Sequence, residues 1–187
     1  MISHIRESVA LQGELLKDAS LPGKYAKAVE MILETLKRGG KVLVAGNGGS
    51  AADAQHFAAE FVATFKKEKR NGYPVLALTT DTSYLTAWAN DFDYADIFAR
   101  EVQTWGKTGD VFIGISTSGN SENIFRAMGE AKKSGLQTVG LLGNGGGKIK
   151  GQCDIDFTIP SASTAHIQEM HMLILHALCE EVVPQLK

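Results

Sequence analysis

The sequence predicts an α/β fold in which a parallel β-sheet is covered by helices on both faces. Short apolar runs, typical of buried strands, alternate with longer segments of helical pattern along the whole chain. Parallel strands need crossover connections, and helices are the usual ones. The length of 187 residues suits one domain with a substantial core, and the sequence shows no linker, internal repeat or low-complexity tract. We therefore expect residues 1–187 to form a single domain.

Two helices are expected before the first strand. Apolar residues recur at helical spacing in residues 5–16 and again in residues 26–36. A Pro-Gly pair at positions 22–23 separates the two helices, and a Gly pair at positions 39–40 ends the second. Residues 1–38 are therefore predicted to form a helical extension in front of the sheet.

Five strands, with helices between them, follow this extension. Strands are expected at residues 41–45, 74–78, 110–115, 137–142 and 154–159. Helices are expected at residues 50–65, 83–88, 94–105, 122–133 and 165–183. The segment after the first strand is rich in Ala and Phe and lacks Gly and Pro, which favours a helix, and Ser50 can cap it.

Two loops rich in hydrogen-bonding side chains follow strands of this sheet. The first loop covers residues 46–50 (Gly-Asn-Gly-Gly-Ser), and the second covers residues 116–121 (Ser-Thr-Ser-Gly-Asn-Ser). Strand ends that lead into helix N-termini present free N–H groups and a positive dipole end, so they attract anions. Alone, the first loop is equally a tight turn with a Ser cap. Two such loops predict a phosphorylated ligand, and the missing P-loop Lys favours a sugar phosphate over a nucleoside triphosphate.

Composition argues against several other classes of function. The chain has 19 basic and 21 acidic residues and a net charge of −2, so a nucleic-acid backbone is not an expected partner. It has no apolar run of about 18–20 residues that could span a membrane, and its first residues form an amphipathic pattern rather than a signal peptide. Cys153 and Cys179 lack the spacing of a metal or redox motif, which predicts free thiols in a reducing cytoplasm.

A histidine and a glutamate share one face of the helix expected after the first loop. His56 and Glu60 are four residues apart, which suits two ligands of one metal and suits equally a hydrogen-bonded pair. The apolar neighbours of Glu60 favour burial, which would adapt its carboxyl group to act as a base. His176 lies in a strongly apolar helix, where a lone histidine is more often a core residue.

These motifs resemble those of the sugar isomerase (SIS) domain family, whose members bind phosphosugars through Ser- and Thr-rich loops. The resemblance is carried by residues 45–60, 90–92, 114–121 and 167–171. It implies a three-layer αβα sandwich with a five-stranded, parallel, flavodoxin-like sheet, and a homotetramer with active sites at subunit interfaces. It also implies an aldose–ketose isomerase that converts D-sedoheptulose 7-phosphate to D-glycero-D-manno-heptose 7-phosphate, the first step of nucleotide-activated heptose biosynthesis.

The resemblance further implies which residues form the site. Glu60 and His176 would be the catalytic acid–base pair. Zinc would be bound by His56, Glu60, Gln168 and His176, with no nucleotide or organic cofactor. Substrate contacts would come from Asn47, Gly48, Gly49, Ser50, Glu60, Asn90, Asp91, Ser116, Thr117, Ser118, Ser121 and Gln168. The resemblance gives His171 no such role, and it is expected to be structural or to support the site residues from behind.

One spacing and two substitutions qualify this picture. Gln168 and His176 are eight residues apart, about 12 Å along one helix, so we expect a neighbouring subunit to supply one of them unless the helix is distorted. Related isomerases commonly carry Arg where this chain has Thr64, and Arg or Lys where it has His166. Loss of these fixed charges leaves the reaction class intact and the identity of the phosphosugar open.

Other functions remain open at this stage. A non-catalytic SIS tetramer that binds a replication initiator protein is one alternative, and an isomerase of a different phosphosugar is another. A sugar-phosphate sensor is a third, although no DNA-binding region is attached. A scaffold needs no acid–base pair, so the joint presence of Glu60, Gln168 and His176 favours an enzyme. We expect no nucleic-acid or membrane partner.

The terminal helices carry more apolar positions than one covering layer needs. These positions are Leu11, Leu15, Leu16, Met172, Leu173, Leu175 and Leu178. Helices that are apolar on more than one face are buried on more than one face, and another copy of the chain is the simplest partner. We therefore expect the extension at residues 1–38 to pack in an oligomer.

Overall fold

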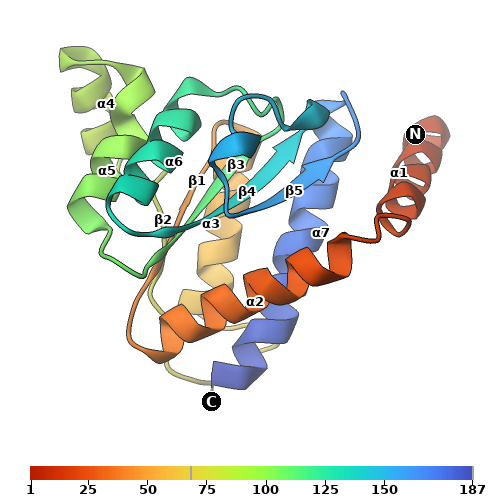
Figure 1. Ribbon diagram of the computed structural model, residues 1–187, viewed down its shortest axis with the longest axis horizontal. Helices are drawn as coiled ribbons and strands as arrows, with labels where there is room; N and C mark the ends of the chain where they lie inside the picture. The colour runs from red at the N-terminus through yellow and green to blue at the C-terminus, as the bar shows by residue number, and fades with distance from the viewer. Residues whose placement is uncertain (68, 187) are drawn as a thin grey trace.

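A five-stranded, fully parallel sheet forms the centre of the molecule (Figure 1). The structure is a computed structural model and describes residues 1–67 and 69–186. The strands are β1 (Val42–Ala45), β2 (Val75–Ala77), β3 (Val111–Ser116), β4 (Gln137–Gly143) and β5 (Ile155–Ile159). They pair in the order β2-β1-β3-β4-β5, which is the flavodoxin-like order, and the predicted α/β class is confirmed.

Helices cover both faces of the sheet. They are α1 (Ile2–Leu15), α2 (Leu21–Lys37), α3 (Gly49–Val62), α4 (Thr82–Asp91), α5 (Ile97–Trp105), α6 (Glu122–Lys133) and α7 (Thr164–Val182). Short 3₁₀ segments lie at η1 (Tyr94–Asp96), η2 (Asn144–Gly146), η3 (Lys150–Gln152) and η4 (Val183–Leu186). Helices α2, α3 and α7 pack on one face, and α5 and α6 pack on the other (Figure 1).

Strands β1 to β4 supply both cores because their side chains alternate between the faces of the sheet, whereas the apolar residues of the edge strand β5 all join one core. In β1, Val42 and Val44 join the core under α2, α3 and α7, whereas Leu43 and Ala45 join the core under α5 and α6. All four residues are buried. Burial on both faces explains why the inner strands β1 and β3 are apolar runs, whereas the edge strand β5 alternates buried apolar residues with half-buried polar ones.

Helix α1 lies at the edge of the molecule beside α7 (Figure 1). Leu11 is its buried residue, while Ile2, Ile5 and Val9 are exposed. At the other terminus, Leu175 and Leu178 are buried and Leu173 is exposed. The apolar surplus of the terminal helices therefore lies partly on the surface of the single chain.

The ends of α3 differ from those predicted. Ser50 is not the N-cap: Gly48, with φ of +57°, precedes the helix, and Ser50 is buried within its first turn. The helix ends at Val62 and does not reach residue 65. Arg70 donates to the carbonyl oxygens of Glu60 (2.6 Å) and Phe61 (2.7 Å), which satisfies acceptors at the helix C-terminus.

Two simpler expectations agree with the structure. Cys153 and Cys179 are free thiols, one half-buried and the other buried. Within the described residues, none of the helices combines the length and the apolar character that a membrane span requires.

Asp110 joins the residues that directly precede β1 and β3, at the edge of the sheet opposite the two loops. Its carboxylate accepts hydrogen bonds from the backbone N–H of Lys41 and of Lys107, both at 2.9 Å, and lies 2.6 Å from Nζ of Lys41. Only 4% of its side chain is exposed. One buried carboxylate therefore satisfies two backbone donors that the ladder leaves unpaired.

We expect Asp110→Ala to lower the free energy of unfolding by about 2–3 kcal/mol, because it strands these two backbone donors. Asp110→Asn retains one acceptor oxygen and should lose less. Urea denaturation of the three proteins measures the difference. An Ala variant as stable as the parent chain would show that water or backbone movement replaces the carboxylate.

Candidate active site

The two polar loops lie side by side at the carboxyl edge of the sheet. The first loop follows β1 and the second follows β3, and these strands pair directly, with Ala45 opposite Gly114. From β1, the chain adds β2 on one side of the sheet and then adds β3, β4 and β5 on the other side. The direction in which strands are added therefore reverses between β1 and β3. Ligands of open α/β sheets bind at such a switch point. The predicted placement of both loops is confirmed.

A reciprocal amide pair joins the first loop to the first turn of α6, directly after the second loop. Nδ2 of Asn47 donates to Oδ1 of Asn123, and Nδ2 of Asn123 donates to Oδ1 of Asn47, both at 2.9 Å. The hydroxyl of Tyr94 also donates to Oδ1 of Asn47 at 2.9 Å. Asn123 is buried and further accepts the N–H of Ile124. Asn47 thus holds the loops together, a role that sequence reasoning missed along with Asn123 and Tyr94.

Three serine hydroxyls gather in the second loop. Oγ of Ser116 lies 2.9 Å from Oγ of Ser121 and 3.4 Å from Oγ of Ser118, which accepts the N–H of Asn120 at 3.1 Å. Ser116 is buried and Ser118 is exposed, so the cluster reaches from the sheet to the surface. Helix α6 begins directly after Ser121. Hydroxyl groups at a helix N-terminus form a suitable cradle for a phosphate group.

Helices α3 and α7 bring a glutamate and two histidines together. Nε2 of His56 lies 2.9 Å from Nε2 of His176 and 3.4 Å from Oε1 of Glu60. The two rings meet edge to face, with centroids 5.0 Å apart. The expected burial of Glu60 is only partial: 22% of its side chain is exposed, and His56 is 46% exposed. Phe57 and Phe61, which directly follow His56 and Glu60 in the sequence, fill the core instead, because they lie on the buried face of α3.

The donor set suits a zinc ion. Zinc bonds of 2.0–2.2 Å in a tetrahedral site place ligand atoms about 3.3–3.5 Å apart. The separations of 2.9 and 3.4 Å around Nε2 of His56 are close to this range, so small side-chain shifts would admit the ion. The same geometry suits a hydrogen-bonded triad, and both interpretations of the His56–Glu60 spacing stay open at this point.

Gln168 and His176 both lie on α7, but they face different turns of α3. A Cβ atom on Gly49 would meet Nε2 of Gln168 at 2.5 Å, so the amide packs against the first loop. Gly49 and His56 are seven positions apart, about 10 Å along α3. Within one chain, His56, Glu60 and His176 therefore lie together. Gln168 lies about two helical turns away from them, as its eight-residue spacing from His176 predicts. That a second chain supplies either Gln168 or His176 to the site stays a prediction.

The remaining expected residues lie around these groups. Asn90 and Asp91 are exposed at the end of α4, joined by a 2.7 Å hydrogen bond, and the chain beyond them reaches the first loop through Tyr94. His171 is structural, as expected: its Nε2–H donates to the carbonyl of Leu142 at 3.0 Å. Burial lowers the pKa of His171 to about 4, so the ring is neutral near pH 7.

Comparison with known proteins shows similarity to the SIS domain family and to phosphoheptose isomerases. The family model of the SIS domain matches residues 10–143. The phosphoheptose isomerase of Clostridium acetobutylicum is 46% identical over 98% of this chain and 93% of its own length. That of Geobacter sulfurreducens is 51% identical over 90% of this chain and 89% of its own. A solved phosphoheptose isomerase from Neisseria gonorrhoeae superposes with a TM-score of 0.91 at 40% identity, covering 98% of this chain and 96% of its own.

A double-mutant cycle measures the link between the two loops. We expect Asn47→Ala and Asn123→Ala each to destabilise the fold, and their combination to cost less than the sum, with a coupling of about 0.5–3 kcal/mol. Urea denaturation of the four proteins gives this value. Pairing Asn123→Ala with Ser134→Ala, at the far end of α6, is the control and should be additive. If the losses in unfolding free energy of Asn47→Ala and Asn123→Ala were additive, the two side chains would not be energetically linked.

Proposed function

The chain belongs to the SIS domain family, and we propose that it is the aldose–ketose isomerase that converts D-sedoheptulose 7-phosphate to D-glycero-D-manno-heptose 7-phosphate, the first step of nucleotide-activated heptose biosynthesis. One observation carries this proposal: Glu60, His56 and His176 meet on α3 and α7, and the first loop leads directly into α3. An acid–base group thus accompanies a phosphate cradle.

The reaction needs two proton transfers, and the site offers a group for each. We assign the carbon-bound proton to Glu60: its carboxylate removes the proton from C1 of the ketose, and the electron pair forms the C1–C2 double bond of an enediol. His176 gives a proton to the oxygen on C2. Glu60 then returns its proton to C2 while the oxygen on C1 loses one to His176. Carboxylate and imidazole pKa values suit these transfers near neutral pH.

The loops account for binding. We assign the phosphate group to Ser116, Thr117, Ser118 and Ser121, whose hydroxyl and backbone donors lie at the N-terminus of α6. The first loop (Asn47, Gly48, Gly49 and Ser50) and Gln168 are adjacent to each other and are assigned to the sugar chain. Asn90 and Asp91 are assigned to the same chain from the end of α4.

Zinc is part of the proposal. His56, Glu60 and His176 would bind it, with Gln168 supplied by a neighbouring subunit as the fourth ligand, and no organic cofactor is needed. When bound, zinc would polarise the substrate carbonyl and stabilise negative charge on the enediol oxygen. The donor set and its spacing support this assignment.

We further propose a cytoplasmic homotetramer with shared active sites. The exposed side chains of Ile2, Ile5, Val9 and Leu173 and the open face of α3 support burial by another copy. The free thiols Cys153 and Cys179 suit a reducing compartment. A monomeric mass in solution with full activity would contradict the shared site.

A different phosphosugar is the second candidate substrate. Thr64 lies exposed just beyond α3, in a position where relatives commonly carry a positive charge. Assays of the purified protein with sedoheptulose 7-phosphate, beside pentulose and hexulose phosphates, decide between these substrates. Preferred turnover of a pentulose or hexulose phosphate would overturn the heptose assignment.

We expect Glu60→Gln to retain the fold and substrate binding while turnover falls at least ~100-fold, because the variant lacks the base. Steady-state kinetics and a substrate-binding titration measure both effects. Glu180→Gln is the matched control, since Glu180 is an exposed carboxylate one turn beyond His176 and pairs with Lys66. Turnover close to that of the parent chain would remove Glu60 from the mechanism.

Ser118→Ala should raise KM about 10-fold with a smaller change in kcat, because the phosphate group is held alike in the ground and transition states. Ser134→Ala, at the other end of α6, should leave both constants unchanged. Should kcat fall while KM stays constant, the second loop would belong to the reacting end of the sugar.

A further inference from the structure

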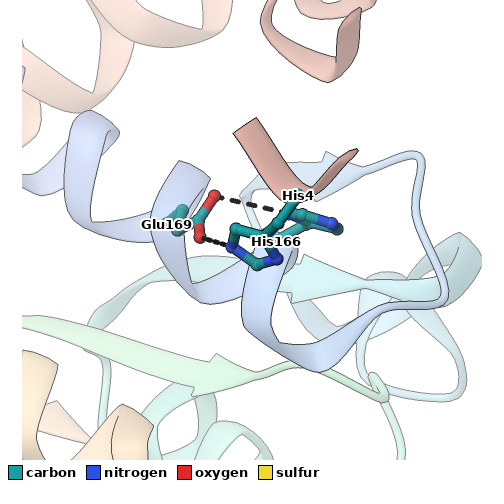
Figure 2. Close-up of side chains that lie close together, drawn as sticks. All are labelled: His4, His166 and Glu169. Carbon is teal, nitrogen blue, oxygen red and sulfur yellow. Dashed lines mark hydrogen bonds and ion pairs between the residues drawn. The ribbon is translucent and has the colours of Figure 1, made fainter. Parts of the chain in front are cut away.

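A second group of histidine and glutamate side chains lies between α1 and α7, outside the site described above. Figure 2 shows Glu169 and His166 on α7 facing His4, which comes from α1. Nε2 of His4 is 2.6 Å from Oε1 of Glu169, and Nδ1 of His166 is 3.4 Å from Oε2 of the same carboxylate. The two imidazole rings lie against each other, with centroids 4.2 Å apart.

The three residues present their ligand atoms to one point. His166 and Glu169 are three positions apart on α7, so they share one face of the helix. One ligand atom from each of His4, His166 and Glu169 lies within 4.8 Å of the others. Zinc ligands lie about 3.3–3.5 Å apart, so contraction of the group by about 1 Å would complete a site. His4 and Glu169 are partly exposed and can make this adjustment.

Hydrogen bonding around His166 favours a cation at this point. The side chain of His166 is 7% exposed, and its Nε2 lies 3.1 Å from Oε2 of Glu7. If Nε2–H donates to Glu7, Nδ1 carries a lone pair that faces an oxygen of Glu169. Two acceptors that face each other need either a proton on Nδ1 or a metal ion between them. A carboxylate on the far nitrogen also orients metal-binding imidazoles, the role that Glu7 would have.

The balance of charges in this group also favours a bound metal ion. Glu7 and Glu169 contribute two carboxylates, and their ion pairs among the described residues are with imidazoles rather than with Lys or Arg. With neutral imidazoles, the group carries two uncompensated negative charges beside a buried ring. One divalent cation neutralises them.

We propose that His4, His166 and Glu169 form a second metal site, which binds a zinc ion and fastens α1 to α7. Two imidazole nitrogens and one carboxylate oxygen are a donor set that zinc prefers, and water completes the tetrahedron. The role is structural: α1 buries Leu11 and little else, so a bond through His4 would add to a weak attachment. The site shares no residue with His56, Glu60 and His176, and it stands whether or not the proposed activity does.

Metal titration of the untagged chain tests the proposal. The protein is freed of metal with a chelator, and zinc binding is followed by calorimetry and elemental analysis in a His56→Gln background, which disables the group on α3. We expect one zinc per chain in this background. Adding His4→Gln should weaken that binding at least ~100-fold, and adding Glu7→Gln about 10-fold, the scale of an outer hydrogen-bond partner. Adding Glu14→Gln, an exposed carboxylate of α1 that pairs with Lys17, should change nothing.

Hydrogen exchange supplies a second readout that does not depend on activity. Zinc should slow amide exchange in residues 2–15 of the His56→Gln chain and leave it unchanged once His4→Gln is added. Unchanged zinc affinity in the His4→Gln chain, or no zinc in the His56→Gln chain with native circular dichroism, overturns the proposal. The group would then be a hydrogen-bonded network of protonated histidines.

Discussion

When β1 pairs with β3 in parallel, both strands must end at the same edge of the sheet, and the two polar loops are brought side by side. The register that sets Ala45 opposite Gly114 leaves each loop one or two residues beyond the ladder. The following helices, α3 and α6, leave toward opposite faces, so their N-termini meet only at this edge. The Asn47–Asn123 amide pair closes the gap between them. Without the pairing of β1 with β3, the two loops would not lie close enough together to bind one phosphorylated sugar.

The proposed acid–base residues depend on a second constraint, the packing of α3 against α7. Phe57 and Phe61 are fully buried between the helices and the sheet, which fixes the rotation of α3. His56 and Glu60 therefore lie on the edge of that helix where His176 can meet them. Arg70 ends α3 by binding the carbonyl oxygens of Glu60 and Phe61, so the last turn, which carries Glu60, is held from outside the helix. Aromatic burial thus sets the geometry of polar groups at the surface.

Hydrophobic periodicity predicted the elements well because each strand and helix carries its own signal. Helix α6 has the predicted bounds, and the strands agree within a residue or two. The errors have a different physical origin. The end of α3 depends on Arg70 beyond the helix, and its start depends on the backbone of Gly48 rather than on a Ser cap. The amide pair of Asn123 joins residues 76 positions apart, and such a contact leaves no periodic trace. The roles proposed for Glu60 and His176 came from family resemblance, since an apolar helix alone suggests a core histidine.

Helix α7 supports separate contacts because successive residues of a helix point about 100° apart. Gln168 packs on Gly49 in the first loop, whereas its neighbours in sequence, His166 and Glu169, face α1. His176, two turns further along, faces His56. A metal ion held by His4, His166 and Glu169 would therefore not compete for Gln168, although it would stiffen the turn on which Gln168 lies. The attachment of α1 would thus be coupled, through one turn of one helix and with no shared ligand, to the position of the Gln168 amide that we assign to the substrate.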